Sequence, residues 1–439
     1  MNARTDLAET VRKRHVAAAV AGNALEFYDF TTYAFYAAQI GRAFFPSETP
    51  LGSLLLSLAT FGAGFVTRPL GAIVIGRYAD KAGRRPAMLL SFMLMGVALL
   101  MLGLCPDYAT IGPLASLIVV IARLVQGFAL GGEVGPTTSF LLEAAPPHRR
   151  GLYTAFQSIS QNAAALVAGV IGIILASLLD SAQLDAFGWR IAILLGAIVL
   201  PFGIIVRRSL PETLHASHPA DHDAETHHAL TGGQVRVILC SIAILCGGTV
   251  ATYIQSYLTT YTSVILHMKV NVAFGATVTY GVTGIVSNII GALLSERHGR
   301  RVVMIVPRIV LMLAILPGFA LLAHNRDGIT LVAITAFMTL CASTSGGAMM
   351  AAIAESLGKA NRASTFSIVY AAPIVVFGGA TQLVVTWLIQ VTGDTLAPAY
   401  FYLGATIVAV IGMIALRESA PARLPAAGAA AIATAAATG

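Results

Sequence analysis

Charged residues are scarce in this sequence. Asp, Glu, Lys and Arg make up 11% of its 439 residues, whereas 57% of the residues are hydrophobic. A soluble domain carries about 25% charged residues, so this composition excludes a soluble globular protein. The hydrophobic residues form runs of about 20, long enough for a helix to cross a bilayer. Because a backbone in lipid must satisfy its own hydrogen bonds, these runs predict an all-α integral membrane protein.

Cysteine is rare, and motifs for catalysis are missing. The four cysteines lie within or at the edge of hydrophobic runs and form no C-x-x-C pair, which argues against a disulfide framework or a zinc site. The sequence contains no G-x-S-x-G, no Walker loop and no H-E-x-x-H. We therefore expect no enzyme activity, no cofactor and no metal. The missing nucleotide-binding motif also excludes transport driven directly by ATP.

The net charge of +7 does not indicate a nucleic-acid partner. The basic residues stand in short loops between hydrophobic runs, a distribution that reflects membrane topology. Twenty of the 27 Lys and Arg residues fall at the two termini and in the loops on one side, and four fall in the loops on the other side. Because basic loops stay in the cytoplasm, we expect both termini there, in a multi-pass protein of the inner (plasma) membrane.

Twelve hydrophobic runs qualify as spans, six on each side of the longest loop. They lie near 15–40, 53–76, 87–105, 115–144, 152–179, 189–207, 236–266, 272–294, 302–323, 329–357, 365–391 and 400–416. The sequence thus predicts two six-helix bundles. The expected segments are a cytoplasmic N-terminus (1–14), a first bundle (15–207), a cytoplasmic linker (208–235), a second bundle (236–417) and a disordered tail (418–439). The linker is rich in His without the regular spacing of metal ligands, so we interpret it as a solvated connection.

A short charged segment, Gly76–Arg85, separates two hydrophobic runs, and Ser295–Arg301 does the same in the second half. Superimposing these segments aligns an acid and two arginines of one with an acid and two arginines of the other. Two halves with the same loop in the same place are typical of a transporter with a parallel internal repeat. We expect these charges, with a second repeated acid, to act in gating at the cytoplasmic side: Asp80, Arg84, Arg85, Glu143, Glu296, Arg300 and Arg301.

Acidic residues inside spans are candidates for proton coupling. A charge at bilayer depth costs about 2.5–3.5 kcal/mol, so it normally lines a cavity or has a partner. In the first span Glu26 and Asp29 share one polar face with Asn23 and Tyr33. Two carboxylates that close cannot both ionise cheaply, which suits a proton carrier. A structural acid paired with an Arg of a neighbouring span is the alternative. We expect Glu26, Asp29 and, in the fourth span, Glu133 to carry protons.

Buried cations and amides are candidates for substrate binding. Arg123 lies about eight residues from the outer end of its span, or roughly 12 Å, which is midplane depth. Its guanidinium suits a carboxylate, and an acid such as Glu133 or one in the first span should neutralise it when the site is empty. Arg308 is expected to extend to the cytoplasmic side instead. The full predicted substrate set is Asn23, Tyr33, Arg68, Arg123, Gln126, Gln157, Gln161, Tyr253, Tyr257 and Tyr370.

The pattern G-x-x-x-D-x-x-G-R-R at Gly76–Arg85 resembles the signature loop of the major facilitator superfamily. Further stretches are similar to its metabolite:proton symporter branch, and the last two resemble citrate and tricarballylate carriers. They are Gly22–Phe30, Gly64–Gly71, Arg123–Glu133, Arg207–Thr213, Thr392–Asp394 and Tyr153–Ser158. The resemblance implies two six-helix bundles, a midplane site, alternating access and proton-driven uptake of a small organic anion, such as the di- or tricarboxylates citrate and tricarballylate.

Other functions remain as alternatives. A membrane-embedded enzyme would need catalytic motifs, a channel needs no paired gating loops, and a sensor usually carries an added soluble domain. Within the same family, the substrate could be 2-oxoglutarate, shikimate or an osmolyte such as proline or betaine. Some osmolyte carriers have a coiled-coil tail, whereas this tail has no heptads. The sequence leaves open the acid, the number of protons and the choice between proton and sodium coupling. We expect a monomer whose partners are the substrate and protons.

Overall fold

The computed structural model describes residues 2–82, 84–131, 150–208, 232–357 and 362–418. Throughout these ranges the chain is helical, without a β-strand. Nine helical segments in them are long and apolar enough to cross a membrane, and Leu89–Leu104 is a shorter apolar helix. Together with the first and sixth spans, they form the twelve-helix fold that the sequence predicts.

The first half supplies spans one to six. Its helices are α1 (Asn2–Phe35), α2 (Ala37–Phe44), α3 (Pro50–Val66), α4 (Arg68–Ala82), α5 (Arg84–Leu104), α6 (Tyr108–Ile111), α7 (Pro113–Leu130), α9 (Arg150–Leu178), α10 (Ser181–Gln183), η2 (Leu184–Gly188) and α11 (Trp189–Arg208). The first two spans are each broken once, at Tyr36 and at Thr67. Helix α1 starts at Asn2, so residues 2–14 of the predicted N-terminal segment continue the first span as a helix.

The second half supplies spans seven to twelve. Its helices are α12 (Gly232–Thr260), η5 (Tyr261–Ile265), α13 (Val270–His298), α14 (Arg300–Asn325), α15 (Gly328–Ser356), α16 (Arg362–Pro373), η6 (Ile374–Gly378), α17 (Gly379–Thr392) and α18 (Ala397–Ala415). The π-helical segment η6 joins α16 to α17 within a single span. Most of the predicted linker and nearly all of the predicted tail lie outside the described residues, so those domain boundaries remain predictions.

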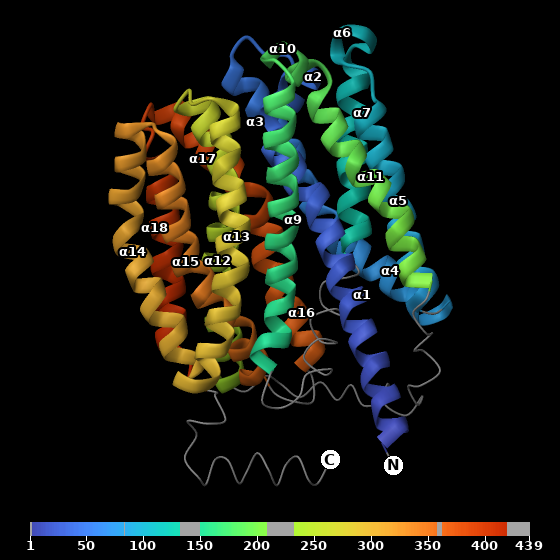
Figure 1. The fold of residues 1–439 in the computed structure, drawn as a ribbon, viewed down its shortest axis with the longest axis vertical. Coiled ribbons are helices and arrows are strands. Elements are labelled where there is room, and N and C mark those ends of the chain that lie inside the picture. Colours follow the sequence, from blue (N-terminus) through green and yellow to red (C-terminus); the bar gives the residue numbers. More distant parts are fainter. Residues whose placement is uncertain (1, 83, 132–149, 209–231, 358–361, 419–439) are drawn as a thin grey trace.

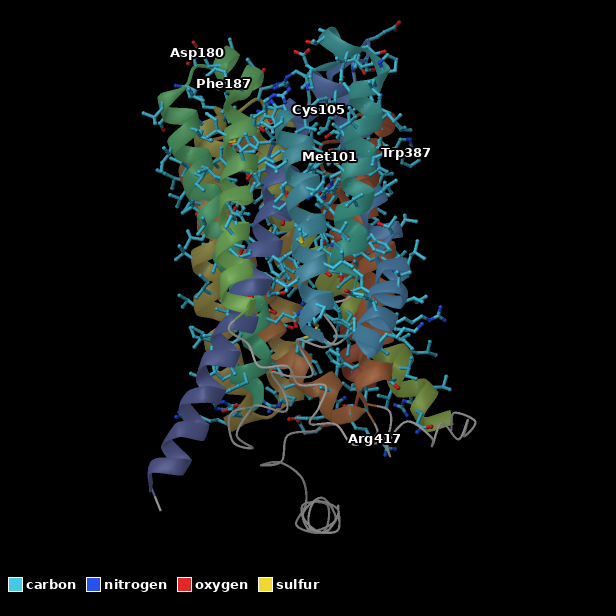
Figure 2. The ribbon with its side chains drawn as sticks, turned by 90° about the vertical axis from the view of Figure 1, so that its right-hand side faces the viewer. Met101, Cys105, Asp180, Phe187, Trp387 and Arg417 are labelled. Carbon is cyan, nitrogen blue, oxygen red and sulfur yellow. The ribbon has the colours of Figure 1, made fainter. Side chains whose placement is uncertain are left out.

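The helices run side by side between two ends, which we call upper and lower as drawn in Figure 1. Helices α2, α6 and α10 lie at the upper end, and the start of α1 lies at the lower end. Figure 2 places Asp180 at the upper end and Arg417 at the lower end. The first helix therefore begins at the end of the molecule where the last helix finishes, as an even number of spans requires.

Aspartates start several helices in the loops. Asp107 accepts a hydrogen bond from the backbone N–H of Thr110 at the start of α6, and Asp327 accepts from Ile329 and Thr330 at the start of α15. Hydrogen bonds from the threonine hydroxyl and from the backbone lower the pKa of both carboxyls. These N-caps satisfy N–H groups that a helix leaves without an internal partner.

Glycines let the two halves pack closely against each other. Helix α13 of the second half packs along α9 of the first, and α17 packs against α3. A Cβ atom built on Gly281 of α13 would lie 2.6 Å from the Leu166 Cβ of α9. Likewise, a Cβ atom on Gly62 of α3 would lie 3.0 Å from the Gly379 carbonyl oxygen of α17. Small residues of this kind allow helix backbones to approach closely in a membrane.

Candidate functional site

A cavity of about 110 Å³ lies between the two halves. Its wall includes α1, α4 and α9 of the first half and α12 to α16 of the second. The charged, amide and tyrosine side chains of this wall are Arg68, Gln161, Asn162, Tyr253, Gln255, Tyr280, Asn288, Arg308 and Tyr370. Within the described part of the chain the cavity wall contains two arginines and no acidic residue. The cavity is therefore suited to an anion.

Arg68 reaches the cavity from the first residue of α4. Its guanidinium carbon lies 4.1 Å from the centre of the Phe65 ring and 4.7 Å from that of Phe30. These cation–π contacts stabilise a charge that is largely removed from water. Gly131 at the end of α7 lets this helix approach α4 closely. A Cβ atom at this position would lie only 2.0 Å from the Arg68 carbonyl oxygen. The prediction that Arg68 faces the interior agrees with this geometry.

Arg308 reaches the same cavity from α14, in the second half. Its side chain is 1% exposed, and its Nε and Nη1 atoms have no hydrogen-bond partner among the described residues. The expectation that Arg308 extends to the cytoplasmic side is therefore wrong. The physical reason is its position on the helix, since it shares a buried face with Met304, Leu311 and Ile315. An arginine can extend its aliphatic stem and place its charge in water only from a helix face that leads to the membrane surface.

Asp29 of α1 and Arg123 of α7 form a buried ion pair. Asp29 Oδ2 lies 3.5 Å from Arg123 Nη1, and the two side chains are 1% and 0% exposed. Arg123 Nη1 also donates a hydrogen bond to Gln126 Oε1. The first-span acid expected to neutralise Arg123 is thus Asp29. Arg123 is not part of the cavity wall.

Aromatic rings separate this ion pair from the cavity. The Arg123 guanidinium carbon lies 4.3 Å from the Tyr33 ring centre and 5.1 Å from that of Phe30. Phe30 therefore contacts both Arg123 and the cavity residue Arg68. Phe30 in turn packs 4.7 Å from Phe61, measured between ring centres. The Phe30 ring thus contacts both an arginine of the ion pair and an arginine of the cavity wall.

The other predicted substrate residues divide into two groups. Gln161, Tyr253 and Tyr370 line the cavity. Gln157 lies next to it, and its Nε2 donates to the Tyr370 hydroxyl at 3.3 Å across the two halves.

Four predicted substrate residues make hydrogen bonds away from the cavity wall. Asn23 donates to Ser160 Oγ at 2.7 Å, Tyr33 donates to the Ser57 carbonyl at 3.1 Å, and the Tyr257 hydroxyl accepts from Thr386 at 2.7 Å. Gln126 binds Arg123. These side chains join neighbouring helices, and their binding role remains a prediction.

The predicted set did not include several wall residues. They are Asn162, Gln255, Tyr280, Asn288 and Arg308. Gln255 and Tyr280 lie on helices whose polar residues do not form a single face, so helical spacing alone would not distinguish them. Asn288 had a clearer signal, because an amide at bilayer depth requires a polar environment.

Several predicted functional residues cannot be placed from the structure. Glu133 and Glu143 lie outside the described residues, as do the side chains of Glu26, Asp80, Arg84 and Arg85. Their roles in proton coupling and gating remain predictions.

The second charged loop is hydrogen-bonded to several helices of the second half. Arg300 binds Glu355 at the end of α15 through Nη2 at 3.2 Å and Nε at 3.3 Å. Its Nη1 donates to Ser295 Oγ at 2.6 Å. The backbone N–H groups of Arg300 and Arg301 donate to the carboxylate of Glu418, which follows α18. The loop thus ties the lower ends of four helices together, namely α13, α14, α15 and α18. Its gating role remains a prediction.

Replacing Glu355 by Gln should lower the free energy of unfolding by about 1.5–3 kcal/mol, as for a lost hydrogen bond between charged groups. The Arg300 and Glu355 side chains are only 4% and 12% exposed, so water replaces the pair poorly. Denaturation of the purified protein in detergent measures the change. The control is Asp185→Asn in the exposed Arg42–Asp185 pair, whose side chains are 46% and 43% exposed. Its loss should cost about 1 kcal/mol or less. Equal effects of the two substitutions would contradict the prediction.

Comparison with known proteins identifies the relatives of this chain. A sequence profile described as Major Facilitator Superfamily matches residues 19–287. The citrate-proton symporter of Klebsiella pneumoniae is 34% identical over 403 residues, which cover 90% of this chain and 88% of the symporter. A putative proline/betaine transporter of Staphylococcus aureus is 28% identical over 410 residues, covering 92% and 87%.

The fold also matches solved structures. The xylose transporter XylE from E. coli, in a partially occluded inward open conformation, superimposes with a TM-score of 0.77 over 93% of this chain and 99% of XylE. At 14% sequence identity this likeness concerns the fold alone.

Proposed function

Because the chain belongs to the major facilitator superfamily, we propose that it takes up a small organic anion, with citrate or tricarballylate as the best candidates, by symport with protons. Its relatives by sequence and fold are transporters. The named relative that supports the substrate class is the citrate-proton symporter. In this proposal the cavity between the halves is the substrate site, reached alternately from each side of the membrane.

One observation supports an anion above other substrates. The described cavity wall has the guanidinium groups of Arg68 and Arg308 and no carboxylate. A polycarboxylate loses its hydration when it enters the bilayer, and fixed positive charges offset that loss. Guanidinium groups suit this task because two parallel hydrogen bonds match the two oxygens of a carboxylate.

The osmolytes proline and betaine are the alternative, because transporters of that name are among the relatives. Both are zwitterions, so each also brings a positive charge into the site. That charge would be opposed by Arg68 and Arg308, with no described acid in the wall to stabilise it. Aromatic rings such as Tyr253 and Tyr280 could contact an ammonium group, but they do not balance two arginines.

We assign proton coupling to the Asp29–Arg123 pair. Protonation of Asp29 would remove the negative charge that neutralises Arg123. The Arg123 guanidinium, no longer neutralised, would then repel the Arg68 guanidinium more strongly. Both groups contact the ring of Phe30. An arriving anion near Arg68 would relieve this repulsion, so anion binding and protonation would favour each other. This assignment moves Arg123 from substrate anchor to coupling residue, because Arg123 lies outside the cavity wall.

The topology proposal follows from the basic residues. Most of them occur at the termini and in loops on the same side, so the lower end in Figure 1, where α1 begins, should face the cytoplasm. Since one chain contains the whole cavity, we propose that the monomer is the transporting unit.

Uptake into vesicles tests the proposal. The purified protein is reconstituted and offered radiolabelled citrate, tricarballylate, 2-oxoglutarate, shikimate, proline and betaine, with and without an inward proton gradient. We expect a polycarboxylate to accumulate only with the gradient. Accumulation of proline or betaine alone would overturn the substrate class. Accumulation that follows a sodium gradient but not a proton gradient would overturn the coupling ion.

A further inference from the structure

Arg308 is a buried cation that has no counterion among the described residues. None of its described neighbours within ion-pair or hydrogen-bond distance is an acid, and its Nε and Nη1 atoms are unpartnered. Arg123, its equally buried counterpart in the first half, has Asp29 beside it. A charge at bilayer depth is costly unless a partner is present. The described side chains thus leave Arg308 available to a group that enters the cavity.

The second half supplies no acid at this depth. Its described acids all stand at or beyond helix ends, where the chain leaves the membrane, and they are Glu296, Asp327, Glu355, Asp394 and Glu418. Arg308 lies eight positions after Arg300, or about 12 Å along α14. Internal rearrangement of the described side chains would not bring a carboxylate to it.

The wall around Arg308 is built for a polar ligand. Asn288 of α13, Gln255 of α12 and Ser343 of α15 line the same cavity. The Asn288 amide donates to the Gly284 carbonyl at 2.8 Å, which fixes its orientation. Gln255 accepts from Thr339 at 2.5 Å, so its amide is fixed as well. Oriented amides of this kind lose little freedom when they bind a ligand.

Arg68 and Arg308 come from different halves and line the same cavity. We propose that Arg308 binds one carboxylate of the substrate while Arg68 binds another, so that the site selects anions with at least two carboxylates. This inference rests on the proposed transport of an organic anion and narrows its substrate class. Such an anion bridges the two halves and stabilises the arrangement in which both enclose it. A monocarboxylate satisfies only one of the two arginines.

Binding of a graded series of acids to the purified full-length protein tests this inference. The series is tricarballylate, glutarate and butyrate, with three, two and one carboxylates, applied to wild type and to Arg308→Gln. Wild type should prefer tricarballylate and glutarate over butyrate. Arg308→Gln should weaken binding of the two polycarboxylates by about 10-fold or more, as for a lost charge-assisted bond, and should change butyrate binding little. A variant that keeps the wild-type preference would overturn the proposal.

Thermal unfolding distinguishes a binding role from a structural role. Because no described residue is a counterion of Arg308, Arg308→Gln should leave the melting temperature of the empty protein unchanged or raise it. The rise that tricarballylate produces in wild type should disappear. A lower melting temperature in the empty variant, with the ligand-induced rise intact, would show that Arg308 is structural. The matched control is Arg326→Gln, which removes the same charge from the exposed end of α14.

Arg308→Lys covers the case in which Arg308→Gln does not fold. It keeps the charge but loses the forked geometry, so polycarboxylate affinity should fall about 10-fold. Wild-type affinity in Arg308→Lys would overturn the role of the guanidinium. If wild type itself binds none of the acids, the proposed function and this inference both fail. If wild type binds them and both Arg308 variants bind equally well, only the inference fails.

Discussion

Asp29→Asn should abolish accumulation of substrate against its gradient while sparing the exchange of labelled for unlabelled substrate. Asn cannot release or accept the proton that drives uptake, whereas the cavity wall is unchanged. With one proton per substrate, a gradient of one pH unit supports about 10-fold accumulation, and this should fall to about one-fold. Uptake and exchange are measured in the same proteoliposomes, with inner and outer pH set separately.

Loss of Asp29 also leaves Arg123 buried without its acid. Breaking a buried pair on one side costs about 3–5 kcal/mol, so Asp29→Asn should be less stable than wild type. The double variant Asp29→Asn with Arg123→Gln should regain stability without regaining accumulation. Asp107→Asn is the control, because Asn also caps a helix well and Asp107 is not buried. If Asp29→Asn still accumulated substrate, Glu26 or Glu133 would be the coupling acid instead.

Gly281→Leu should reduce uptake by about 10- to 100-fold. The new side chain would occupy space now filled by Leu166 of α9, since even a Cβ atom at Gly281 would lie 2.6 Å from the Leu166 Cβ. Overpacking of this kind costs about 1–3 kcal/mol, and each 1.4 kcal/mol lowers the population of the packed arrangement about tenfold. Helices α9 and α13 would stay apart at this contact, so the carrier could bind substrate but seldom close around it.

Gly275→Leu on the same helix is the matched control for Gly281→Leu. Nothing lies within 4 Å of a Cβ atom built on Gly275, so its uptake should stay near the wild-type rate. Citrate binding should remain within a few-fold of wild type in both variants. Wild-type uptake in Gly281→Leu would show that the close contact of α9 with α13 is not required for transport.

The fold could be predicted from the sequence because its main determinants are local. Runs of about 20 apolar residues are set by bilayer thickness, and the repeated charged loop gives the symmetry between the halves. These features, and the family, are confirmed by the helices and the relatives. The breaks at Tyr36 and Thr67 were not predicted, since each lies inside a stretch that the sequence predicts as one span, 15–40 or 53–76.

The candidate site was less predictable because it depends on contacts between distant helices. A polar face in the first span indicated Asp29, but only the packing of α1 against α7 shows that Asp29 neutralises Arg123. Arg308 illustrates the opposite case. Its distance from the charged loop suggested extension toward water, whereas the face on which it stands is decided by the neighbours of α14. Spacing within one helix predicts the depth of a side chain and the residues on the same face. It does not predict which neighbouring helix covers that face or which residue binds the side chain.

The π-helical segment η6 makes the length of the eleventh span a constraint in its own right. A π-turn contains one residue more than an α-turn, and each residue of an α-helix corresponds to a rotation of about 100°. Below η6, Tyr370 faces the cavity; above it, Gln382 donates to the Tyr253 carbonyl at 3.3 Å. If the same residues were wound as a regular α-helix, Gln382 would rotate by about one residue, or roughly 100°, relative to Tyr370, and the two side chains could no longer both reach their partners. Homologous carriers that keep both contacts should therefore either keep a π-turn here or have lost one residue from this segment, which restores a regular helix with both faces in place.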